Sequence, residues 1–186
     1  MSELMKFRLE ELKKAPLDTF VELEGSDFPV MVTTEGLMMI YGHPYRVSNT
    51  GGFFSSAIAA AGGHTGVIVL FKEVLEKITA SSLAAVLSHE EAHLKLGHIE
   101  SANAGSVKMT KNRTMDNLQF EMEADRHSAE KHGSVAVAKA LEEVIHVTVD
   151  AVVPEKTRFR KAVVKILSLM TIHSGQIKKR RKALLA

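Results

Sequence analysis

The sequence of 186 residues contains no cysteine. Disulfide bonds and thiolate zinc sites are therefore excluded, while the redox compartment is left open. The first ten residues include acidic side chains and no apolar core segment, so we expect no signal peptide and favour a cytoplasmic location. The remaining composition, 45% hydrophobic and 25% charged, is typical of a globular protein with one core, and we expect residues 1–186 to form a single domain.

The sequence also lacks a long, uniformly apolar run. Val47–Phe71 contains no formally charged residue, but glycine, serine and asparagine interrupt it, and the most apolar stretch breaks after Ala61. A membrane-spanning helix needs about 20 predominantly apolar residues. We therefore interpret this region as a small-residue segment, a Gly-Gly turn and a buried strand at Gly66–Leu70.

What the sequence does contain is the motif S-H-E-E-A-H at Ser88–His93. His89 and His93 are four residues apart, so on a helix they lie one turn apart on one face, where two imidazoles can bind one Zn²⁺. Glu90 lies between them and can act as general base on a water held by the zinc ion. Apolar residues at helical spacing precede the motif and Gly97 follows it, which favours a helix over about Ser82–Leu96.

A second motif, E-M-E-A-D at Glu121–Asp125, begins 28 residues after His93. A catalytic zinc site uses three protein ligands and keeps one position open, and Glu121 is our candidate for the third ligand. Asp125 shares its helix face and is placed to accept the other ring N–H of a ligating histidine. The alternatives are a solvated His/Glu-rich helix and an ordinary acidic helix face.

The other elements can be assigned coarsely. We expect an α+β fold, mainly helical, with a small sheet beside the metal-site helix. The expected elements are a helix at Glu3–Lys14, a hairpin of Phe28–Thr33 with Leu37–Tyr41, a loop from His43, helices at Lys72–Ile78, Met115–Lys131, Ser134–Val149 and Lys156–His173, and a loop at Ser101–Thr114.

With these motifs, the chain resembles the gluzincin family that includes the HtpX heat-shock metalloproteases, the CAAX prenyl proteases and their soluble relatives. The resemblance rests on Gly66–His93, on A-D-R-H-S-A-E-K-H-G at Ala124–Gly133 and on the segment His173–Leu184. It begins near Val47, leaves residues 1–46 without a clear counterpart, and concerns the catalytic domain without the membrane spans of the larger members. It implies a zincin-like fold with one Zn²⁺ per chain.

The resemblance also implies roles for residues outside the two motifs. The strand Gly66–Leu70 is similar to the family's edge strand, so Val67, Ile68 and Val69 are expected to pair with an extended substrate. A late histidine and arginine of the family correspond to His173 and Arg180, which would act on the oxyanion or cap the zinc. Ser174 replaces the family's proline and Arg180 is displaced by one residue, so a solvated basic tail is the alternative there.

His98 stands five residues after His93, where a metzincin would need glycine at the third and histidine at the sixth position. We therefore interpret His98 as a packing histidine that follows the helix. Another alternative class, the short repressor-cleaving gluzincins of mobile elements, usually carries asparagine where this chain has Asp125.

Charge is concentrated at the C-terminal end, where residues 155–186 hold ten of the 24 basic side chains and one of the 22 acidic ones. This basic helix and tail can contact a membrane surface or a larger assembly, whereas the net charge of +2 does not indicate nucleic-acid binding. We expect a zinc-dependent metalloendopeptidase that cleaves unfolded or flexible polypeptides. The alternatives are a non-catalytic binding or regulatory protein with the zincin fold and an adaptor with an incidental motif.

Overall fold

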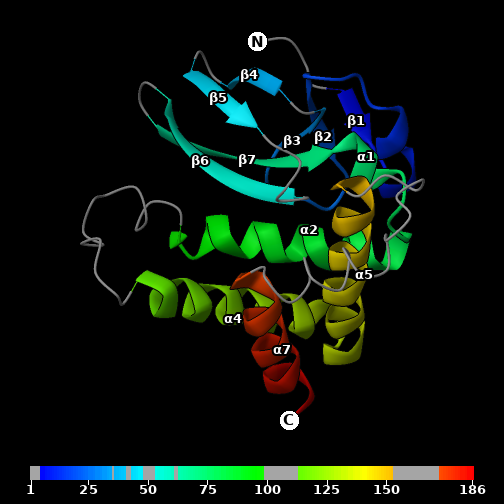
Figure 1. Ribbon diagram of the computed structural model, residues 1–186. Helices are drawn as coiled ribbons and strands as arrows, with labels where there is room; N and C mark the ends of the chain where they lie inside the picture. The colour runs from blue at the N-terminus through cyan, green and yellow to red at the C-terminus, as the bar shows by residue number, and fades with distance from the viewer. Residues whose placement is uncertain are drawn as a thin grey trace.

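The computed structural model describes residues 5–34, 36–40, 43–47, 53–60, 63–98, 113–152 and 172–186. The described elements form two layers, a sheet and a group of helices beneath it (Figure 1). The predicted α+β class, mainly helical with a small sheet, is confirmed.

The main sheet has five strands in the order β1-β2-β3-β7-β6. Their bounds are Met5–Phe7 for β1, Phe20–Leu23 for β2, Val30–Thr33 for β3, Phe53–Ala60 for β6 and Gly63–Phe71 for β7. β7 pairs in parallel with β3 and antiparallel with β6. Two further strands, β4 (Gly36–Ile40) and β5 (His43–Val47), form a separate antiparallel pair.

The helical layer is built on α2 (Ala80–Lys95), which lies alongside α4 (Arg113–His132) in Figure 1. α5 (Ser134–Val152) contacts both of these helices, and α7 (Ile172–Leu185) packs against α4 and α5. A short helix α1 (Lys72–Leu75) follows β7, and a 3₁₀ helix η1 (Leu9–Lys14) follows β1. Among the described residues, no helix combines the length and apolar character that a membrane crossing requires.

Two predictions for the N-terminal third are wrong. The expected helix Glu3–Lys14 is instead strand β1 followed by η1, because Met5–Phe7 pairs in parallel with Val21–Leu23. The expected hairpin partner of β3 is also incorrect: β4 pairs with β5, and the region from His43 expected as a loop is therefore a strand. In both cases strand pairing, which local propensity does not report, decides the structure.

The prediction that Gly66–Leu70 is an edge strand is also wrong. β7 has a neighbour on each side, and Val67–Phe71 have no exposed surface. A continuous apolar run is typical of a strand covered on both faces, and burying each such side chain is worth about 1.5–3 kcal/mol. The edge strand beside α2 is β6, which pairs with β7 and contacts that helix.

Gly66 allows β7 to approach the metal-site helix closely. A Cβ atom at this position would lie 2.8 Å from Cδ2 of Leu94 on α2 and 2.9 Å from Cδ1 of Phe28. Any larger residue would therefore require the side chains of Leu94 and Phe28 to shift. Most of the expected helix Lys156–His173 and most of the expected loop Ser101–Thr114 lie outside the described residues, while Ile172 and His173 belong to α7.

Candidate metal centre

Helix α2 fixes the two motif histidines. It begins after Thr79, whose hydroxyl accepts the N–H of Ser82, and it ends before Gly97, which adopts a φ of 68°. Thr79 in turn donates its N–H to Glu143 of α5 at 2.7 Å. Both ends of α2 are thus set by local capping and by a contact with a neighbouring helix.

His89, His93 and Glu121 converge at the contact between α2 and α4. Their candidate ligand atoms all lie within 4.8 Å of one another. The two Nε2 atoms are 3.0 Å apart, and they lie 3.4 and 3.5 Å from the two carboxylate oxygens of Glu121. Two imidazole nitrogens and one carboxylate that face a common point form a donor set suited to Zn²⁺.

Asp125 stands behind His89. Its Oδ1 atom lies 2.9 Å from Nδ1 of His89, on the side of the ring opposite to Nε2. At this distance the two groups form an ion pair, and a proton kept on Nδ1 beside the carboxylate leaves the Nε2 lone pair for a metal. The geometry therefore suits the predicted role of Asp125 in fixing the tautomer of His89.

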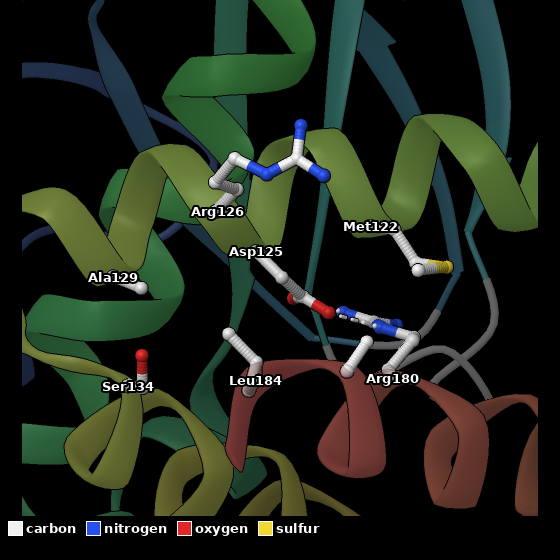
Figure 2. A pocket seen from close by; sticks show the side chains of 8 residues that line it. Met122, Asp125, Arg126, Ala129, Ser134, Arg180 and Leu184 are labelled. Carbon is white, nitrogen blue, oxygen red and sulfur yellow. Dashed lines mark hydrogen bonds and ion pairs between the residues drawn. The ribbon is translucent and has the colours of Figure 1, made fainter. Parts of the chain in front are cut away.

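Arg180 reaches this site from α7. Its Nε and Nη2 atoms each donate to an oxygen of Asp125 at 2.6 Å (Figure 2). Its Nη1 atom lies 2.5 Å from Oε2 of Glu121. The residue is buried, with 8% of its surface exposed. The alternative of a solvated tail is therefore incorrect for Arg180, which neutralises the two acids of the centre.

A cavity of about 110 Å³ lies beside this ion pair, between α4, α5 and α7. Figure 2 shows that Asp125 and Arg180 meet at its wall, together with apolar side chains such as Leu184. Ligand pockets usually measure about 300–1,000 Å³, so this cavity is too small to receive a peptide. It is a packing gap behind the acids.

The surroundings of the histidine pair favour a single positive charge, on His89. Burial lowers the pKa of His89, but hydrogen bonds with Asp125 and Glu121 outweigh burial and raise it to about 9. Burial, with repulsion from His89, lowers the pKa of His93 to about 4. Burial opposes ionisation of Glu121, yet His89 and Arg180 lower its pKa to about 2, so this carboxylate is ionised at neutral pH.

Glu90 follows His89 on α2 and is buried, with 9% of its surface exposed. Its charge raises the pKa of both His89 and Arg180, which places the carboxylate within electrostatic range of the centre. The predicted base therefore lies in the same buried cluster as the candidate ligands. By contrast, Ile68 and Val69 pair with both β3 and β6, and Val67, which pairs with Ser56 of β6, is fully buried.

The interpretation of His98 as a packing histidine after the helix agrees with the structure, but the sequence analysis did not predict the polar contacts of its ring. This buried residue follows Gly97, and its Nδ1 lies 3.0 Å from Nδ1 of His93 while its Nε2 lies 3.1 Å from Oε2 of Glu123. The signal was present in the sequence as H-x-x-x-G-H, because a glycine that ends a helix turns the next residue away from the helical path. His173 lies on α7, but its side chain is outside the described residues.

The profile of Peptidase family M48 matches residues 55–152, which run from β6 to the end of α5. The chain belongs to this family and is therefore a member of a metallopeptidase family. No curated protein and no solved structure matches the chain significantly. The match includes the three candidate ligands, whereas Arg180 lies beyond it.

Proposed function

We propose that this chain is a zinc-dependent metalloendopeptidase, with one Zn²⁺ held by His89, His93 and Glu121. The observation that carries the proposal is the convergence of the three ligand atoms within 4.8 Å, in a chain that belongs to peptidase family M48. A bound zinc ion supplies Lewis acidity, which polarises a carbonyl and makes water a stronger nucleophile near neutral pH.

Glu90 is the general base of the proposed reaction. It accepts a proton from the attacking water and then donates a proton to the leaving amine, so the peptide bond breaks without a covalent enzyme intermediate. Its position directly after a candidate ligand on α2 supports this role. A purely binding protein with this fold has no requirement for a carboxylic acid at that position.

The other residues hold the centre in shape. Asp125 orients His89, and Arg180 neutralises Asp125 and Glu121, so the two acids can lie close together in a buried site. Asp125 and Arg180 are therefore positioning residues in this proposal. His173 as an oxyanion donor or zinc cap remains a prediction from the family resemblance.

The proposed substrate is an unfolded or flexible polypeptide segment. An extended chain can add to a sheet edge through its main chain, and β6 is the edge strand that contacts α2. Within the family, we place the chain near the soluble relatives of the HtpX and CAAX branch, and we propose a cytoplasmic location. The basic end of the chain is a candidate contact for a membrane surface or a larger assembly.

The test compares the parent chain with Glu90→Gln, which keeps the shape of the side chain but removes its basicity. Both proteins should contain about one zinc per chain. Glu90→Gln should cleave an unfolded reporter polypeptide more slowly by several orders of magnitude, because proton transfer is lost. Equal cleavage by the two proteins would refute the assignment of Glu90, and a zinc-free parent that zinc does not stabilise would refute the metal site.

A further inference from the structure

His98 is held on both sides of its imidazole ring. Nδ1 faces Nδ1 of His93 at 3.0 Å, and Nε2 faces the Glu123 carboxylate at 3.1 Å. The ring also stacks on Phe120, with centroids 4.4 Å apart and an interplanar angle of 15°. Only 4% of the residue is exposed, so its orientation is fixed by protein contacts.

These contacts define one consistent arrangement of protons. A carboxylate only accepts, so Glu123 accepts the proton on Nε2 of His98. In the neutral ring this leaves Nδ1 of His98 as an acceptor, and it receives the N–H from Nδ1 of His93. Nε2 of His93 then carries the lone pair, and this is the atom that faces His89 and Glu121.

The backbone explains how His98 reaches this place. On a continuing helix, a residue five positions after His93 would point away from it, because each residue turns the helix by about 100°. Gly97 adopts a φ of 68°, which stops α2 and redirects the chain. This turn places His98 back against the ring of His93, on the side away from the candidate ligand atoms.

We propose that His98 and Glu123 are positioning residues for the zinc ligand His93. Glu123 and His98 would fix the tautomer of His93 in the way that Asp125, paired with Arg180, would fix that of His89. For His89 the carboxylate acts directly on the ring, and for His93 it acts through the imidazole of His98. This inference rests on the proposed zinc site.

The experiment measures the zinc dissociation constant by competition with a chelator for the parent and three variants at His98. In His98→Asn the amide oxygen lies near the position of Nδ1 and can accept from His93, whereas in His98→Gln the amide extends toward the position of Nε2. His98→Leu has neither group. We expect the His98→Leu and His98→Gln variants to bind zinc about 10- to 100-fold more weakly than the parent. The dissociation constant of His98→Asn should stay within about threefold of the parental value.

Glu123 is tested with a matched control on the same helix. Glu123→Ala should weaken zinc binding about tenfold, because His98 loses the acceptor that fixes its proton. Glu130→Ala removes an exposed acid seven residues further along α4 and should leave zinc affinity unchanged. Equal effects of the two substitutions would indicate a general loss of negative charge and would overturn the role of Glu123.

The melting temperatures of the zinc-free proteins distinguish the proposed positioning role of His98 from a purely structural role. If His98 only fills space, each variant should lose melting temperature and zinc affinity together. The proposed role instead predicts that the His98→Asn and His98→Gln variants have similar zinc-free melting temperatures but different zinc affinities. If His98→Leu does not fold, the comparison of Asn with Gln decides. If the parent protein binds no zinc, both the metal site and this inference are refuted. If the parent binds zinc and the His98→Leu and His98→Gln variants bind it equally tightly, this inference alone is refuted.

Discussion

Arg180 and Asp125 form a two-point contact in which two guanidinium nitrogens each lie 2.6 Å from a different carboxylate oxygen. The planar guanidinium matches the carboxylate geometry, and lysine cannot reproduce this fork. Both side chains are buried, so the pair ties α7 to the acidic face of α4. The stability of the centre therefore depends on a residue outside the segment that matches the family.

Arg180→Met should lower the free energy of unfolding of the zinc-free protein by about 3–5 kcal/mol, because Asp125 is left buried without its cation. Arg180→Lys should have a smaller effect, since it keeps the charge and loses the fork. Arg181→Met is the control: its partner Glu142 is partly exposed, and such a pair is worth about 0–1 kcal/mol. Urea denaturation measures all three, and a similar loss for Arg180→Met and Arg181→Met would contradict this assignment.

His93→Ala should remove most of the zinc from the purified protein, because it deletes one of three ligands. His146→Ala, which changes an exposed histidine on α5, should retain about one zinc per chain. Metal analysis after dialysis against a weak chelator gives the answer. Retention of stoichiometric zinc by His93→Ala would exclude this residue from the ligand set.

Zinc binding at pH 6 should release about one proton per chain. The zinc-free protein holds a proton on His89, whose pKa is raised to about 9, while His93, with a pKa of about 4, is already neutral. Zinc requires neutral imidazoles, so protons compete with it and affinity falls as the pH is lowered below 9. Calorimetry in buffers of different ionisation enthalpy counts the protons, and release of none or of two would contradict the prediction.

Proline replacements in β6 test whether substrate adds to that edge. Successive N–H groups along a strand point to opposite sides, so of Ser55 and Ser56 one donates toward β7 and the other outward. Proline at the inward position should lower the melting temperature, because it removes a ladder hydrogen bond. Proline at the outward position should leave the protein stable but raise KM for an unfolded polypeptide.

The pair Ala57 and Ile58 repeats this comparison two residues further along β6. Stable variants at both outward positions with parental KM would remove β6 as the substrate edge. Proline at Ile68 or Val69 should unfold the protein instead, because these two residues pair with strands on both sides.

The candidate ligand set could be proposed from the sequence because each half of it depends on a short helical spacing. His89 and His93, and likewise Glu121 and Asp125, are four residues apart, and a helix converts that spacing into a shared face without help from the rest of the fold. Capping also acts locally, and the expected helix over Ser82–Leu96 agrees closely with α2. Helical spacing does not report that α2 and α4 lie together; that expectation came from the third ligand that a catalytic zinc site requires, and the family resemblance agreed with it.

The wrong predictions concern partners that lie far away in the sequence. Met5–Phe7 becomes a strand only because Val21–Leu23 is available to pair with it, and β7 is interior only because β3 lies on its other side. The interpretation of His98 as a packing residue agrees with its burial, but its contact with Glu123 was not predicted, because that contact depends on how α4 lies against α2. Residue spacing predicts which side chains share a face of one helix. It does not predict these contacts, because they are made between different elements.

Arg180 follows Asp125 by 55 residues in the sequence, yet its positive charge lies between the two acids of the centre. A ribosome makes a chain from its N-terminus, so both histidines, the base and both acids exist well before the cation that neutralises them. During that interval the two acids lack their guanidinium partner. The centre is therefore complete only when α7 has been made and has packed against α4.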